Sequence, residues 1–168
     1  MYLFFPDNTV LVNFATIGRV DLLEKLANSN GRWCLSVSRE CAMSARIAGL
    51  EALSSVRQFL GEPLEPTPAE LLDTRVLRDR MAAPGDRQTK HLGEAETITI
   101  VTSRDLRSKA IFVSDDTDAL VHAVAQGIKV ADTWDLLELA ERVGAINTEE
   151  HAQYVTALRS AGRSRPRR

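Results

Sequence analysis

Acidic side chains follow two short apolar runs of the sequence, "YLFF" and "AIFV". Asp7 comes after the first run, and Asp115, Asp116 and Asp118 come after the second. A further acid, Glu94, opens a segment that carries the signals of a helix start. Carboxylates held close together repel one another, which raises their pKa values. A hard divalent cation such as Mg²⁺ or Mn²⁺ would relieve that repulsion, so these residue types indicate a metal site.

The elements expected around these acids form an α/β fold. Both apolar runs are typical of short buried strands, and further strands are predicted at "WCLSV" and "IKVAD". Strands that alternate with helices imply parallel crossovers, and hence a three-layer α/β/α domain with a central parallel sheet. Because the carboxyl ends of parallel strands meet at one edge of the sheet, the acids are expected to share a cleft.

Helical spacing of apolar residues covers most of the remaining chain. The predicted helical segments are residues 9–32 as two helices, 39–60 after a cap at Ser38, 69–81 opened by Pro68, 116–127, 133–144 and 147–162. Residues 92–109 are ambiguous, because their first carboxylates favour a helix start whereas "TITIVT" alternates like a strand. Residues 1–160 are therefore predicted to form one domain, followed by a flexible basic tail at 161–168.

The composition leaves the partner of this domain open. The chain of 168 residues has 21 basic and 23 acidic residues and a formal net charge of −2, so any nucleic-acid surface must be local. The apolar runs are too short to span a bilayer, and neither a signal peptide nor a membrane contact is expected. Cys34 and Cys41 form no metal-binding or redox pattern, which suits a reducing cytoplasm.

Three segments of the sequence, taken in order, are similar to a known family. They are "DNTVLVNFATIGRVDLLEKL", "LGEAETITI" and "AIFVSDDTDALVHAVAQGIKVADTWDLLELAERVGAI". Together they resemble PIN-domain proteins, in particular a small prokaryotic group with a Gly-Glu motif, loosely in the N-terminal third and closely over 92–160. The resemblance implies a PIN-like fold and a Mg²⁺- or Mn²⁺-dependent endoribonuclease, often the toxin of a toxin–antitoxin pair.

The resemblance assigns roles to individual residues. Asp7 matches the acid that ends the first strand in the family, and Glu94 matches the acid that opens the central helix. Asp116 matches the acid after the later strand, and these three residues are the expected catalytic and metal-binding set. Thr9 matches a hydroxyl residue two positions after the first acid, where it is expected to support the site.

Further metal ligands are expected beside these three. Asp115 and Asp118 flank the acid of the later strand, and Glu40 is the nearest candidate for a family acid on the helix after the second strand. Glu96 is a substitute for Glu40, although a position two residues after Glu94 on a helix faces away by roughly 200°. The competing interpretation of the aspartates is that they are helix caps or turn residues that bind no metal.

The implied reaction is hydrolysis of an RNA phosphodiester bond with the help of a bound cation, and it needs no side-chain nucleophile. RNA requires a positive surface even on a nearly neutral chain. The basic residues expected to line the substrate groove are Arg75, Arg78, Arg87, Lys90 and Arg104. A solvated helix face is the alternative for each of them. His91 either assists the reaction or, in the interpretation favoured by the sequence, is an exposed loop histidine.

Two other functions compete with a nuclease. The first is a PIN-like module that binds RNA or a protein without cleaving. The second is a receiver-like or small-ligand domain that uses Asp115 and Asp116, but Lys129 is its only candidate lysine and no glycine-rich phosphate loop is present. The expected partners are RNA, an antitoxin protein and, through the C-terminal helices, a second copy of the chain.

Overall fold

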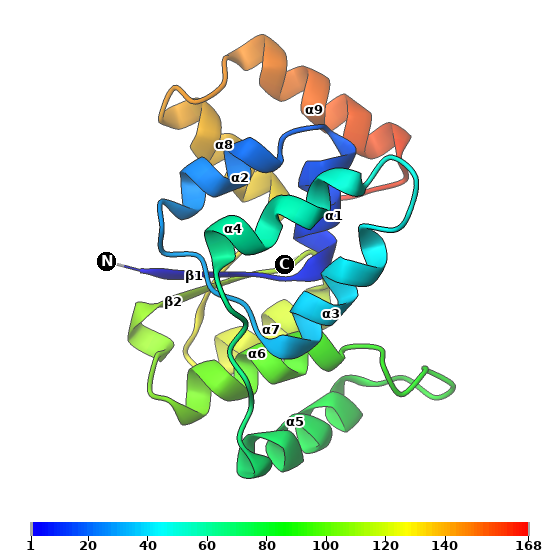
Figure 1. Cartoon of the computed structure of the whole chain (residues 1–168), viewed down its shortest axis with the longest axis vertical. Coiled ribbons are helices and arrows are strands. Elements are labelled where there is room, and N and C mark those ends of the chain that lie inside the picture. Colours follow the sequence, from blue (N-terminus) through cyan, green and yellow to red (C-terminus); the bar gives the residue numbers. More distant parts are fainter. Residues whose placement is uncertain (1, 168) are drawn as a thin grey trace.

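The computed structural model describes residues 2–167 and has an α/β fold. Its parallel sheet has the strand order β1-β2-β3, with β1 at Leu3–Pro6, β2 at Ala110–Val113 and β3 at Lys129–Ala131. Phe5 pairs with Phe112 across the first two strands. Figure 1 shows the strands crossing the middle of the molecule, with helices on either side. The predicted α/β class and parallel sheet are therefore confirmed.

Helices connect the strands and account for most of the described chain. The α-helices are α1 (Asn8–Thr16), α2 (Val20–Ala27), α3 (Leu35–Ser44), α4 (Val56–Leu60), α5 (Pro68–Met81), α6 (Leu92–Ser103), α7 (Thr117–Ala125), α8 (Thr133–Arg142) and α9 (Thr148–Ser160). Two short 3-10 helices, η1 (Glu51–Ser55) and η2 (Arg107–Lys109), precede α4 and β2. All strand-to-strand connections are helical crossovers, as parallel pairing requires.

The two faces of the sheet are buried in separate cores. Phe4 and Val113 pack with apolar side chains of α1, α2, α3, α8 and α9, whereas Phe5 and Phe112 pack with those of α6 and α7. Successive residues of a strand point to opposite faces, which explains this division. Burial of each phenylalanine contributes about 2–3 kcal/mol. Helices thus cover both faces, an arrangement compatible with three layers.

The predicted strand at residues 33–37 is wrong. The chain is extended there only at isolated bridges, from Gly31 to β1 and from Cys34 to residue 64, and α3 begins at Leu35. Cys34, Val37 and Cys41 are buried at spacings of three and four, which is the helical period. The apolar pattern of this segment is therefore that of a helix facing the core.

The helix predicted over 39–60 with a cap at Ser38 is also corrected. Ser38 lies inside α3, and the segment divides into α3, η1 and α4, with Gly49 at a positive φ in the break. The start of α3 is capped from another helix. The Glu96 carboxylate of α6 accepts hydrogen bonds from the Ser36 backbone N–H at 2.9 Å and from its hydroxyl at 2.7 Å.

The ambiguous segment after residue 92 forms the helix α6. Every residue from Gly93 to Val101 is buried, because α6 lies between the sheet and α5 and also packs against α3. A helix buried all round need not show the one-sided apolar stripe of a surface helix. The alternation of "TITIVT" therefore reflects complete burial and not a strand.

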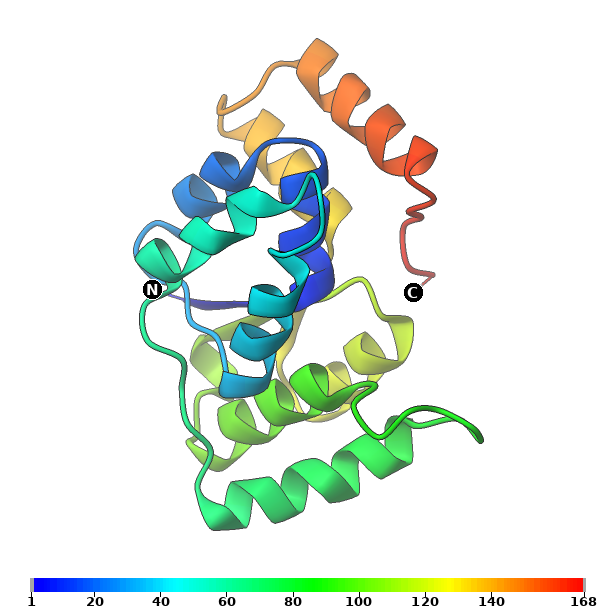
Figure 2. The same ribbon diagram turned by 45° about the vertical axis from the view of Figure 1, so that its right-hand side comes forward.

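The last described residues leave α9 and approach the start of α7 (Figure 2). Within this predicted tail, Arg165 donates hydrogen bonds to Asp135 at 2.6 Å and to Glu138 at 2.7 Å on α8. Among residues 2–167, no helix has both the length and the apolar character that a bilayer crossing requires.

Candidate metal centre

Two aspartates at the carboxyl ends of β1 and β2 are helix caps and also belong to one acidic site, called the cleft below, in which their charges act on each other and on Glu94 and Glu40. Asp7 caps α1, where its Oδ2 accepts from the Thr9 backbone N–H at 3.2 Å and from the Thr9 hydroxyl at 2.8 Å. Asp116 caps α7, where its Oδ1 accepts from the Ala119 N–H at 2.9 Å. Each carboxylate thus uses one oxygen for its helix. The cap and metal-ligand interpretations are compatible, because the second oxygen remains.

The second oxygen of Asp7 is the most unusual polar atom of the site. Asp7 is 1% exposed, and its Oδ1 has no hydrogen-bond partner within residues 2–167. A buried carboxylate oxygen without a partner costs free energy unless a ligand completes its coordination. Thr9 holds the other oxygen in place, so the predicted supporting role of Thr9 matches the geometry.

Glycine allows the two glutamates of the cluster to approach. An added Cβ at Gly93 would lie 2.9 Å from Val37 Cγ2 and 3.2 Å from Glu40 Oε1. Only a residue without a side chain therefore lets the start of α6 lie directly against α3. The close approach brings Glu40, which the sequence offers only as the nearest candidate for a family acid, beside Glu94.

The acids of the cluster raise one another's pKa values. Burial, followed by the charge of Asp7, raises the pKa of Glu94 to about 9 and that of Glu40 to about 7. Burial also raises the pKa of Asp7, and the charge of Asp116 adds to the effect. No lysine or arginine of the described chain forms an ion pair with any of these four acids. Without a metal, these acids therefore limit their mutual repulsion by holding protons and not by pairing with a cationic lysine or arginine.

His91 belongs to this cluster, which corrects the favoured interpretation of an exposed loop histidine. Its side chain is 5% exposed, and its Nδ1 lies 3.9 Å from Glu94 Oε1 and 3.6 Å from Asp116 Oδ2. Ligand atoms of these three residues all lie within 4.8 Å of one another. The sequence does contain a signal for this position of His91. His91 precedes Glu94 by three positions, and residues at that spacing share a helix face.

Asp115 and Asp118, which were predicted as metal ligands, lie outside the cluster. The Asp115 carboxylate accepts from the Thr133 backbone N–H at 2.9 Å, the Thr133 hydroxyl at 2.6 Å and the Asn13 amide at 2.7 Å. Both of its oxygens are therefore occupied in joining β2 to α1 and α8. Asp118 is exposed in the first turn of α7.

Arg104, predicted to bind RNA, is engaged in the fold instead. Its guanidinium donates from Nε to Glu70 Oε1 and from Nη2 to Glu70 Oε2, both at 2.9 Å. A third bond reaches the Glu65 carbonyl at 2.7 Å. Two parallel bonds to one carboxylate form a strong, geometrically specific pair. Arg104 is therefore a structural residue that fixes the end of α6 against the start of α5.

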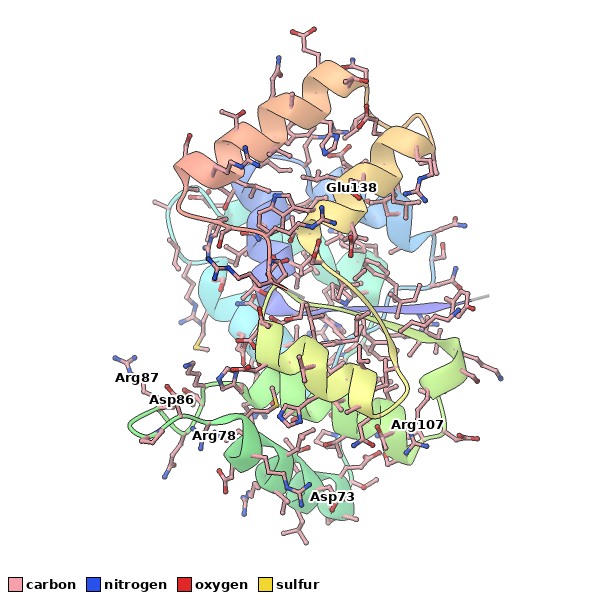
Figure 3. The ribbon with its side chains drawn as sticks, turned by 180° about the vertical axis from the view of Figure 1, so that it is seen from behind. Asp73, Arg78, Asp86, Arg87, Arg107 and Glu138 are labelled. Carbon is pink, nitrogen blue, oxygen red and sulfur yellow. The ribbon has the colours of Figure 1, made fainter. Side chains whose placement is uncertain are left out.

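Arg78 is likewise structural, whereas other predicted RNA contacts remain exposed. Arg78 donates to the carbonyls of Arg87 and Lys90 and so fixes the loop between α5 and α6 (Figure 3). The Lys90 ammonium lies 2.9 Å from Asp86 Oδ1. Arg75 and Arg87 are exposed, the latter at the outer end of the loop. The positive surface is smaller than the sequence predicted.

Comparisons with known protein families, with curated proteins and with solved structures found no match. The resemblance to PIN domains, with the toxin role that it implies, therefore stays a prediction. The donor set itself fits a divalent cation, because it combines carboxylates, one imidazole and one buried oxygen that lacks a partner.

Proposed function

We propose that this chain is a PIN-like, metal-dependent endoribonuclease in which Asp7, Glu94 and Asp116 hold Mg²⁺ or Mn²⁺ and Glu40 completes the acidic site. The observation that carries the proposal is the buried Asp7 Oδ1, which lacks a partner among the described residues and faces acids that no lysine or arginine neutralises. A bound cation would lower the pKa of a water molecule and neutralise charge on the scissile phosphate.

Residues of the chain prepare the cleft for an anionic substrate. Three helices, α1, α6 and α7, begin at the cleft, with Asp7 and Asp116 as caps and Glu94 in a first turn. Helix N-termini present unpaired N–H groups and partial positive charge, which stabilise carboxylates and bind phosphate. Thr9 and Ala119 fix one oxygen of each aspartate, so the geometry of the remaining oxygens is set before a ligand arrives.

A chain-like substrate suits the surroundings of the cleft. A pocket of about 240 Å³ is lined by Thr9, Asp116 and, from the tail, Arg163. The tail and the loop between α5 and α6 project on the same side of the molecule, with the start of α7 between them (Figure 2). Arg163 on the tail and Arg87 on the loop are exposed. A phosphodiester backbone could contact both segments while it crosses the acids.

The proposal is tested by cleavage of a mixed RNA pool with the full chain in Mg²⁺, Mn²⁺ or EDTA. We expect cation-dependent cleavage that Asp7→Asn reduces by at least about 100-fold, because even residues that only hydrogen-bond to a metal ligand contribute about 10–100-fold. The control is Asp73→Asn, the same change at an exposed position of α5 far from the cleft (Figure 3). It should leave the rate unchanged.

Two results would contradict the proposal, the first for the activity and the second for the site. The first is an intact, folded protein that cleaves no RNA with either cation, which would leave a module that binds RNA or protein. The second is equal cleavage by the intact protein and Asp7→Asn, which would place any activity outside this cleft.

A further inference from the structure

His91 is held in a position that its local backbone does not favour. It occupies the N-cap position of α6 with a φ of 62°, in the left-handed region that non-glycine residues rarely adopt. Its side chain makes no capping hydrogen bond. A conformation of this kind persists only where the surroundings fix it, and the His91 ring is surrounded by the acids Asp86, Glu94 and Asp116.

The imidazole ring lies between acids on both sides. Its Nδ1 faces Glu94 and Asp116 at 3.9 and 3.6 Å, and its Nε2 lies 3.9 Å from Asp86 Oδ2. These separations exceed hydrogen-bond lengths, and no hydrogen bond of the ring is present within residues 2–167. The ring is therefore a buried polar group whose nitrogens approach acids without bonding to them.

The separations suit ligands that share one ion. Atoms bound to a cation at about 2.0–2.2 Å lie roughly 3–4 Å from one another. The two distances from Nδ1 fall in that range. Asp86 on the opposite side of the ring corresponds to the carboxylate that commonly orients a metal-binding histidine through its other nitrogen. Asp86 is itself fixed, because its oxygens accept from the Ala83 N–H and the Lys90 ammonium.

An independent observation also points to a ligand in this part of the molecule. Asp7 Oδ1 is buried and lacks a partner within the described part of the chain, and the charge of Asp7 acts on Glu94. Glu94 is thus the common neighbour of His91 and of the unsatisfied oxygen. One ion at this position would contact the carboxylates of Glu94 and Asp116 as well as the imidazole, with the charge of Asp7 close enough to act on Glu94.

We propose that His91 is a ligand of the metal in this cleft and that it makes the site prefer a first-row transition ion, such as Mn²⁺, to Mg²⁺. The inference rests on the metal site of the proposed function. Mg²⁺ prefers oxygen ligands and keeps several waters, whereas first-row transition ions bind imidazole readily. A cleft of carboxylates alone would bind either ion, so the histidine supplies the discrimination.

The test is metal binding by the full chain without RNA. Nitrogen couplings in the pulsed electron paramagnetic resonance spectrum of bound Mn²⁺ report directly on an imidazole ligand, and titration calorimetry gives the affinities for Mn²⁺ and Mg²⁺. We expect a nitrogen coupling in the intact protein that disappears in His91→Asn. Asparagine tolerates the left-handed backbone, so this variant should fold.

His91→Asn should weaken Mn²⁺ binding by about tenfold or more and Mg²⁺ binding much less. The matched control, His122→Asn on α7, should change neither affinity. Absence of the nitrogen coupling in the intact protein, or equal weakening of both ions in His91→Asn, would overturn the proposal.

These outcomes separate the inference from the nuclease. Mn²⁺ binding with a nitrogen coupling but no RNA cleavage would retain the ligand and reject the nuclease. Cleavage supported equally by Mg²⁺ and Mn²⁺, with no nitrogen coupling, would retain the nuclease and reject His91 as a metal ligand.

Discussion

A buried glutamate lies at each end of α6, Glu70 near the C-terminal end and Glu94 near the N-terminal end. The pKa of the first carboxyl is lowered, whereas that of the second is raised. Near the C-terminal end, Glu70 accepts from Arg104 and from the Ser103 hydroxyl, and these bonds hold its pKa well below the usual range. At the N-terminal end, burial and neighbouring acids raise the pKa of Glu94 to about 9. Glu70 thus has an arginine partner, whereas Glu94 has neither a lysine nor an arginine partner among the described residues.

Helix dipoles do not explain the difference. Glu70 lies in the first turn of α5, where it forms a capping box with Thr67, and Glu94 lies in the first turn of α6. Both positions favour a negative charge to a similar extent. The difference is Arg104, which has no counterpart among the described residues at the cleft. The comparison supports a cleft whose positive charge comes from a ligand.

The sharpest test replaces each glutamate by glutamine at pH 8 in EDTA. Glu70→Gln should lower the free energy of unfolding by about 2 kcal/mol, because the partly buried Arg104 loses its charged partner. Glu94→Gln should raise it by at least about 1 kcal/mol, because the folded state no longer has to hold a proton on residue 94 that the unfolded state releases at this pH. Urea unfolding measures both. Destabilisation of similar size by both variants would show that the cleft acids are compensated after all.

Three acids of the cleft carry a local sequence signal, whereas Glu40 does not. Asp7 comes directly after β1, Asp116 lies three residues after the end of β2, and Glu94 follows the glycine at the start of α6. The positions of His91 and Asp115 depend on contacts with residues distant in the sequence, Asp116 in one case and Thr133 in the other. No local pattern shows which of two adjacent aspartates will meet a threonine from α8.

The elements of the fold that have a local sequence pattern could also be predicted. Short apolar runs predict buried strands, and apolar residues at helical spacing predict helices with one buried face. The error at residues 33–37 arose where a helix start follows an extended bridge, and the start of α3 is capped by Glu96, about sixty residues later in the chain. Burial of α6 on all sides likewise depends on α5, whose packing the sequence does not specify.

The pH dependence of stability should distinguish the two ends of α6 in metal-free protein. The raised pKa values of Glu40, about 7, and Glu94, about 9, mean that the folded state holds protons which the unfolded state releases near pH 4.5. Their contribution is fully present below pH 4.5 and is lost as the pH rises through 7 and 9. Glu70 behaves oppositely, since its contribution is lost only as the pH falls below 4.5.

Between pH 5 and 9 the free energy of unfolding in EDTA should therefore fall by several kcal/mol, because each group contributes up to about 1.4 kcal/mol per pH unit below its folded-state pKa. Glu94→Gln should remove much of this slope, whereas Glu70→Gln should leave it unchanged. Chemical unfolding at several pH values gives the slope. A flat profile in the intact protein would contradict repulsion in the cleft.

The smallest effect is expected where an arginine meets acids at the surface. Arg165 is 45% exposed and contacts Asp132, Asp135 and Glu138, so its charges are screened by water and salt. Arg165→Gln should change the free energy of unfolding by about 0.5 kcal/mol, and 1 M NaCl should remove most of that difference. Thermal unfolding with and without salt measures it. A loss as large as that of Glu70→Gln would mean that burial does not set the strength of these pairs, and the contrast between the ends of α6 would then need another cause.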